Sequence, residues 1–239
     1  MIREVSLDEI SDGKLYTDND LVKAETSGCS GCAAMCCKDM DNNIVLDPRD
    51  IFEIIRASKE VEEQETGESL KFSDFDSLLA SEYIQLNLVD GIILPNINMK
   101  NESRACSFLN DSDRCTIHSY RPGICRMFPL GRYWESSDKF YYILQKNQCY
   151  KDGLAKVKVK NWLGIEDLEE YSSFSSNWHK YLCDVRAEMA NLSEENRQIF
   201  NLYNLKSFYK TAYRAKNLTG FYREFSMRLK KVRKELNLD

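Results

Sequence analysis

Four cysteines lie within nine residues near the start of the chain, in the segment CSGCAAMCC, and thiols at this density indicate metal or redox chemistry. They are Cys29, Cys32, Cys36 and Cys37, spaced Cys-x2-Cys-x3-Cys-Cys. A Cys-x2-Cys turn directs both sulfurs to one side of a tight loop, which suits the capture of zinc or of cluster iron. Neighbouring side chains diverge in extended backbone. The adjacent pair is therefore predicted to bind two different metal atoms, or to leave one sulfur unbound.

Four further cysteines follow after a long gap, and a ninth lies beyond them. Thiolate is a soft ligand that selects zinc, copper(I) or iron–sulfur centres over magnesium and calcium. The ninth, Cys183, falls within a helical run and is predicted to be a small buried hydrophobic residue. The sequence thus predicts a split ligand set whose two halves meet in space: Cys29, Cys32, Cys36, Cys37, Cys106, Cys115, Cys125 and Cys149.

The identity of the metal stays open at this level. Eight thiolates allow two zinc sites, one 4Fe–4S cluster with a zinc ion, or one cluster with spare cysteines. A 4Fe–4S cluster is favoured because the spacing is not that of two zinc-ribbon knuckles and an adjacent pair suits a multinuclear site; zinc is the alternative. A disulfide scaffold is the least favoured reading, since nine cysteines cannot all pair.

The composition is that of a soluble globular protein, with 43% hydrophobic and 30% charged residues among 239. The net charge of −5 argues against a general attraction to nucleic acid. The N-terminus has no secretory pattern, and no apolar run is long enough for a membrane span. We therefore expect a cytoplasmic protein without a membrane partner, whose partner is an unidentified protein or small molecule. In that reducing compartment cysteines serve more often as metal ligands than as disulfides.

The first part of the chain reads as short helices and strands. A helix is predicted over 46–60, with Asp47 as its N-cap and Pro48 at its first position. A second short helix is predicted over 71–83, and a hairpin over 83–97 that turns at Asp90-Gly91. Residues 110–113 carry turn chemistry, and 140–144 reads as a further strand.

Helix dominates from Trp162 onward. One helix is expected to end near Asn191, a second to start at Ser193 and run to Lys216, and a third to start at Thr219 and run to about Leu236. An apolar stripe at helical spacing is expected to pack on the cysteine-rich part: Leu202, Leu205, Phe208 and Tyr209.

These elements together predict an α+β fold. It consists of a small cysteine-rich metal-binding domain with short strands and helices (residues 1–155), closed by a C-terminal helical bundle or lid (residues 156–239) that packs on it.

Three polar side chains near the second cysteine group are candidates for contacts around a metal or cofactor. Arg121 and Arg126 bracket Cys125, where they would neutralise thiolate charge or hold an anionic substrate, or else only fix the loop. His118 would supply a nitrogen ligand or carry a proton, or only pack. The span Lys206–Lys234 holds ten Lys or Arg against one acidic residue. An alternative function is therefore a zinc-stabilised interaction module whose basic C-terminal helices bind a partner.

The first cysteine motif resembles the signature of the CxxCxxxCC family, the YkgJ-like zinc- or iron-chelating proteins. A second block of this sequence is similar to that family's second motif, with His118 standing where tyrosine is usual. Cys149 stands where the family's last cysteine is expected. The matching positions of the second block are Cys106, Phe108, Leu109, Cys115, Ile117, Arg121, Pro122, Cys125, Arg126, Phe128 and Pro129.

This resemblance implies metal binding and leaves catalysis open. Members of the family resemble the flagellin lysine N-methylases in their cysteine cluster, which implies an iron–sulfur centre. If the chain is an enzyme, the resemblance favours a metal-dependent, methyltransferase-like or redox modification enzyme. The spacing is the reverse of the usual radical S-adenosylmethionine motif, which weakens a radical mechanism.

Overall fold

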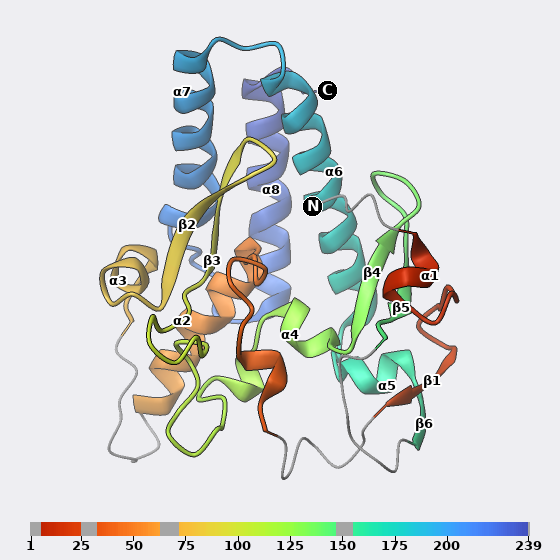
Figure 1. Cartoon of the computed structure of the whole chain (residues 1–239). Helices are drawn as coiled ribbons and strands as arrows, with labels where there is room; N and C mark the ends of the chain where they lie inside the picture. Colours follow the sequence, from red (N-terminus) through yellow and green to blue (C-terminus); the bar gives the residue numbers. More distant parts are fainter. Residues whose placement is uncertain (1–5, 25–32, 63–71, 147–154, 239) are drawn as a thin grey trace.

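The computed structural model describes residues 6–24, 33–62, 72–146 and 155–238. These residues form helices and three two-stranded antiparallel sheets (Figure 1), which confirms the predicted α+β class. Their helices are α1 (Leu7–Ile10), α2 (Pro48–Glu62), α3 (Phe75–Ala80), α4 (Gly123–Met127), α5 (Val159–Leu163), α6 (Leu168–Met189), α7 (Glu194–Leu205) and α8 (Leu218–Glu235). Their strands are β1 (Leu21–Ala24), β2 (Ile84–Val89), β3 (Ile92–Ile97), β4 (Leu130–Trp134), β5 (Phe140–Leu144) and β6 (Ala155–Lys158).

Helix α2 begins as the sequence predicts. The Asp47 side chain accepts a hydrogen bond from the Asp50 backbone N–H at 2.9 Å, and the Asp50 carboxylate accepts one from the Asp47 N–H at 3.1 Å. The two bonds satisfy N–H groups that have no partner inside the helix. Pro48 is the first helical residue and Ile54 is fully buried, so this helix starts at a fixed point and presents an apolar face.

The β2–β3 hairpin turns at Asp90 and Gly91, as predicted. Their φ angles are +50° and +85°, which is the left-handed backbone that a two-residue hairpin turn requires. The chain just before α2 adds to the other edge of β3, where the Leu46 N–H donates to the Pro95 carbonyl at 2.8 Å. The hairpin is therefore tied to the start of α2 as well as to itself.

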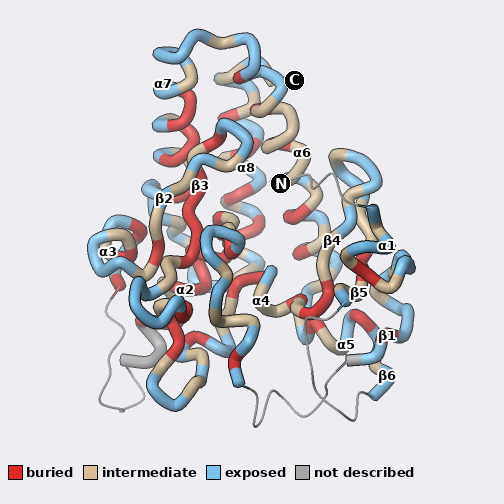
Figure 2. Tube along the Cα trace, viewed as in Figure 1, coloured by how far each residue is buried: buried red, intermediate tan, exposed pale blue. Residues whose placement is uncertain are grey.

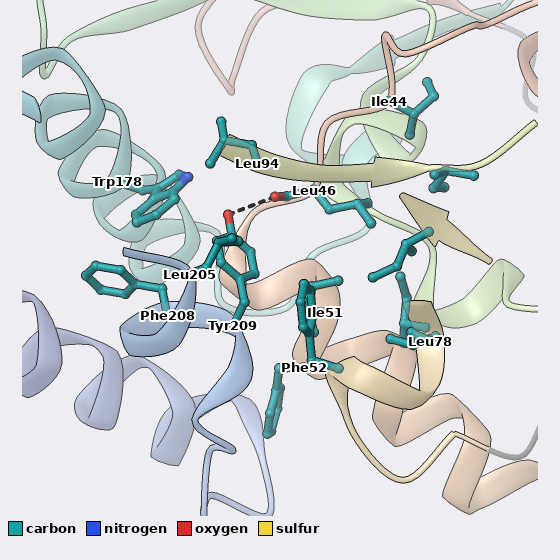
Figure 3. Close-up of a cluster of buried hydrophobic side chains, with 14 of the residues drawn as sticks. Ile44, Leu46, Ile51, Phe52, Leu78, Leu94, Trp178, Leu205, Phe208 and Tyr209 are labelled. Atoms are coloured by element: carbon teal, nitrogen blue, oxygen red, sulfur yellow. Dashed lines mark hydrogen bonds between the residues drawn. The ribbon is translucent and has the colours of Figure 1, made fainter. Parts of the chain in front are cut away.

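Helices α6, α7 and α8 stand side by side behind the hairpin and α2 (Figure 1). Their aromatic side chains join the core of the first half of the chain, where Trp178, Phe208 and Tyr209 lie near Leu46 and Ile51 (Figure 3). The Tyr209 hydroxyl donates to the Leu46 carbonyl at 3.0 Å inside this core. Buried segments run along β3 and the inward faces of the helices (Figure 2), so the C-terminal helices pack on the cysteine-rich part as predicted.

The C-terminal helices differ from the prediction in two boundaries. The helix that starts at Ser193 ends in a π-helical turn, Lys206–Lys210, and does not reach Lys216. The last helix is capped by Asn217, whose side chain accepts from the Gly220 N–H at 2.9 Å, so the prediction of a Thr219 cap is wrong. Asparagine is preferred over threonine at the N-cap.

Two residues predicted to be buried are not. Leu202 is 65% exposed, because the buried face of α7 passes through Asn201, Asn204 and Leu205, and Leu202 lies about 100° around the helix from Asn201. Cys183 is half-buried, with its Sγ 3.8 Å from Nδ1 of His179. His179 stacks on Trp134 at 3.7 Å between ring centroids.

A smaller assembly contains the β4–β5 and β1–β6 pairs and α5, with a separate small core that includes Leu130, Tyr142 and Leu163. Strand β5 has the bounds predicted for it. The β1–β6 pair joins residues 21–24 to residues 155–158. The division of the chain at about residue 155 stays a prediction. Among the helices of the described residues, none combines the length and apolar character needed to cross a membrane.

Candidate metal centre

Five of the eight predicted ligands line one cavity of about 370 Å³, called the thiol cavity below. The rest of its wall is mostly apolar, with side chains such as Ile44, Phe108 and Ile117. Cys29, Cys32 and Cys149 lie outside the described residues. The five cavity cysteines are Cys36, Cys37, Cys106, Cys115 and Cys125.

The first cysteine group ends in a 3₁₀ turn, Met35–Cys37, that follows Ala34 in the left-handed region at φ +55°. The turn brings the Sγ atoms of Cys36 and Cys37 to 3.9 Å from each other. The expectation that this pair diverges is therefore wrong, because the backbone is coiled here and not extended. The Cys37 carbonyl then accepts from the Cys106 N–H at 2.7 Å, which joins the two halves of the predicted set.

The second group is held by a loop whose turn chemistry was predicted. The Asn110 side chain accepts from the Arg114 N–H at 2.9 Å, and a β-bridge pairs Leu109 with Cys115. A 3₁₀ turn, His118–Tyr120, leads into the short helix α4, which carries Cys125. These local bonds direct Cys106, Cys115 and Cys125 into the same cavity.

Helix α4 is positioned by residues that the sequence did not mark as part of the site. Oδ1 of Asp50 accepts from the Gly123 N–H at 2.8 Å, two residues before Cys125. On the other side, a Cβ on Gly123 would lie 2.0 Å from the Tyr171 hydroxyl oxygen of α6. Sequence patterns did not indicate Asp50 or Tyr171 as part of the site, since neither contact is local in sequence.

Burial keeps the thiols of Cys106, Cys115 and Cys125 protonated when no metal is bound. It raises the pKa of Cys106 to about 12, with smaller contributions from Cys115 and Cys36, and it raises the pKa of Cys125 well above its usual value. A hydrogen bond with Cys37, together with burial, raises the pKa of Cys36 as well. Since thiolate is the metal-binding form, a metal that enters this cavity must displace protons.

One cationic side chain at the cavity wall, Arg121, opposes this effect. Arg121 lines the cavity and favours the thiolate forms of Cys36 and Cys115. Its Nη1 lies 2.7 Å from Nε2 of His118, and burial with the nearby arginines lowers the pKa of His118. The neutral ring therefore accepts this bond. Arg126 donates to the Ser119 carbonyl at 2.7 Å.

The chemistry of this donor set fits a soft metal. Among the described residues no group of three His, Cys, Asp or Glu side chains is arranged to hold an ion by itself. The set nevertheless offers five thiols, and within the described residues the buried Nε atoms of Arg121 and Arg126 have no hydrogen-bond partner. Such donors suit the sulfur atoms of an anionic metal centre. The roles of Arg121, Arg126 and His118 around a cofactor stay predictions.

A protein-family model matches residues 28–150, just over half of the chain. The model is named CxxCxxCC, and it is described as a "Putative zinc- or iron-chelating domain". The chain belongs to the CxxCxxCC family. This confirms the family that the cysteine motifs indicated. The CxxCxxCC domain spans both cysteine groups and α4, and zinc or iron is the metal that its description names. No curated protein and no solved structure matches the chain significantly.

Proposed function

We propose that the CxxCxxCC domain binds a thiolate-ligated metal centre in the thiol cavity. The observation that carries this proposal is the convergence of five cysteines, from segments far apart in sequence, on one cavity. Thiolate–metal binding energy contributes directly to folding in such sites. The proposed ligands are Cys29, Cys32, Cys36, Cys37, Cys106, Cys115, Cys125 and Cys149.

A 4Fe–4S cluster is the centre that we favour. A zinc ion and a 4Fe–4S cluster each take four protein ligands, so the five thiols do not by themselves distinguish the two centres. The cavity volume of about 370 Å³ is far larger than the space between four sulfurs that hold one ion at about 2.3 Å. Hydrogen bonds to sulfur tune such clusters, and Nε of Arg121, which lines the thiol cavity, is a buried donor without a partner among the described residues. A cluster would supply electron transfer or an iron atom that binds a substrate.

Zinc is the second candidate, favoured by one distance. Two sulfurs on a tetrahedral zinc ion lie about 3.8 Å apart, from the Zn–S length of about 2.3 Å. The Sγ atoms of Cys36 and Cys37 are 3.9 Å apart. That pair is therefore spaced for a single ion, whereas cysteines on different irons of a cluster lie farther apart.

Metal and sulfide analysis of protein purified without air decides between the two. We expect iron and acid-labile sulfide in equal amounts, with a visible absorption band that is lost in air. Colourless protein with zinc alone and no labile sulfide would refute the cluster and retain zinc. Protein with no tightly bound metal, isolated from cells supplied with iron and zinc, would refute the proposal as a whole.

If the domain is an enzyme, we propose that its metal centre supports a modification reaction, either methyl transfer or a redox step. Such a reaction requires a metal position that protein ligands leave open. Support comes from Cys36 and Cys125, which line a second cavity as well as the thiol cavity. The partner would then be a protein or a small molecule, and a reducing compartment such as the cytoplasm would keep the thiols available.

The alternative of an interaction module with basic C-terminal helices has less support. Arg228 pairs with Glu224 at 2.7 Å, and Arg233 pairs with Asp184 at 2.7 Å, so part of the positive charge is used inside the fold. Lys230 and Lys234 are exposed. Binding of an acidic partner that is lost in Lys230→Glu/Lys234→Glu would favour this alternative.

A further inference from the structure

A second cavity, of about 530 Å³, shares Cys36, Ile44 and Cys125 with the thiol cavity. It lies between the β2–β3 hairpin, the chain before α2, and helices α4 and α6. Its volume is in the range of small-molecule sites, which is about 300–1,000 Å³. Two of the cysteines proposed to bind metal therefore face a cavity that can hold a small molecule.

Most of the wall of the second cavity is apolar. Val89, Ile92 and Leu94 come from the hairpin, and Leu182 comes from α6. Ile92 and Leu94 are only 1% and 4% exposed, so the floor is part of the protein core. A ligand would gain affinity here mainly by removing apolar surface from water.

The charged side chains of this wall are already paired. Arg186 of α6 binds Asp90 at the hairpin turn with 2.6 Å between nitrogen and oxygen, and Asp39 binds Arg104 at 2.6 Å. No other charged residue lines the cavity within the described part of the chain. An ionic ligand would bring an uncompensated charge into an apolar space, which is costly. The wall thus selects a neutral molecule.

One hydrogen-bond donor remains on the wall. Nε of Arg186 is buried and has no hydrogen-bond partner among the described residues. A buried donor without a partner costs free energy, which a ligand acceptor such as a carbonyl oxygen would recover. Asn43 and Gln145 add neutral polar groups to the same wall.

We propose that the second cavity binds a neutral, mainly apolar small molecule with a hydrogen-bond acceptor, one end of which lies against Cys36 and Cys125. The binding site itself depends only on the cavity wall. Its relation to chemistry rests on the proposed function: if these cysteines hold a metal, the bound molecule lies beside it and is the substrate of a metal-dependent modification.

Nile red, a neutral dye with a carbonyl oxygen, serves as the probe for the metal-loaded protein. We expect saturable binding of one dye per chain, with a blue-shifted emission. Leu182→Trp and Val89→Trp fill the cavity from two different elements and are expected to weaken binding at least tenfold. Met227→Trp is the matched control, because Met227 is 60% exposed on α8 and lines neither cavity. It is expected to bind as the native chain does.

Circular dichroism and metal content are measured on each variant, and if one substitution prevents folding the other supplies the test. Absence of saturable binding, or equal binding by both cavity variants and the control, overturns the proposal. Dye emission that is weaker in iron-loaded protein than in metal-free protein, by quenching, supports the position beside the metal. Cavity-dependent binding to a chain that takes up no metal even when iron and zinc are supplied would leave the site standing and refute the proposed function. Iron-loaded protein that does not bind the dye would overturn the binding-site proposal and leave the proposed metal centre standing.

Discussion

Replacement of Gly123 by alanine tests how helix α4 and its Cys125 are positioned. The new Cβ would lie 2.0 Å from the hydroxyl oxygen and 3.2 Å from Cζ of Tyr171, which is fully buried. Overpacking of this kind costs about 1–3 kcal/mol. Alanine favours helix over glycine by up to about 1 kcal/mol. We therefore expect Gly123→Ala to lower the free energy of unfolding by about 1–2 kcal/mol.

Tyr171→Phe removes the atom responsible for the clash. The Tyr171 hydroxyl makes no hydrogen bond of normal geometry within the described residues, so this substitution alone is expected to cost less than about 1 kcal/mol. In the Tyr171→Phe background the closest remaining atom is the ring carbon at 3.2 Å, which a small shift can relieve. Gly123→Ala should then be neutral or slightly stabilising. The coupling energy of the pair is expected to be about 1–3 kcal/mol.

Urea unfolding of the four proteins of this cycle measures the coupling, in reducing buffer with and without metal. The midpoint should change at constant m-value. The proposed function adds a second readout: Gly123→Ala should lose bound metal, because the Gly123 N–H is held by Asp50 two residues before Cys125. If Gly123→Ala costs the same free energy in both backgrounds, the contact with Tyr171 does not set the position of α4 and the steric explanation is wrong.

Three further measurements test the fold and the cavity. Asn217→Ala should cost about 1 kcal/mol by loss of the N-cap, whereas Thr219→Ala should stay within about 0.5 kcal/mol; equal losses in thermal unfolding would contradict the observed cap. Tyr209→Phe should cost about 1 kcal/mol because it removes the buried hydrogen bond to Leu46, while Tyr133→Phe, at a 40% exposed residue, should change stability little. The metal-free protein should lose stability as pH rises above about 8.5, the ordinary thiol pKa, because burial raises the pKa of Cys106 to about 12 and the folded chain retains protons that the unfolded chain releases. Metal-loaded protein should lack that loss of stability, and a flat profile for the metal-free protein would contradict the burial of these thiols.

Local sequence signals were sufficient for the elements that have local causes. The Asp47–Pro48 start of α2 and the Asp90-Gly91 turn depend on hydrogen bonds and φ angles within four residues, and both were predicted. The end of α7 was not predicted from the sequence, because the π turn at Lys206–Lys210 places Phe208 and Tyr209 in a core supplied by distant elements. Helical propensity continues past this point, and only the tertiary packing ends the helix.

The candidate site shows the same difference between features with local causes and features that depend on long-range contacts. Cysteine identity and spacing indicated which side chains meet, and five of them line one cavity. The predicted divergence of the Cys36 and Cys37 side chains was wrong, because a 3₁₀ turn cannot be recognised from cysteine spacing alone. Asp50 and Tyr171 were missed for a further reason: their contacts to Gly123 join residues separated by 73 and 48 positions.

Those long-range contacts connect the thiol cavity to the C-terminal helices. Asp50, at the start of α2, holds the N–H of Gly123, and Tyr171 of α6 limits the space on the other side of that glycine. Arg49, next to Asp50, lies over the Tyr171 ring at 4.9 Å and donates from Nε to the Tyr222 hydroxyl of α8 at 3.0 Å. Because these groups are buried, breaking any one leaves a polar atom without water. The helices α6 and α8 therefore help to fix the position of Cys125, although neither contributes a cysteine to the thiol cavity.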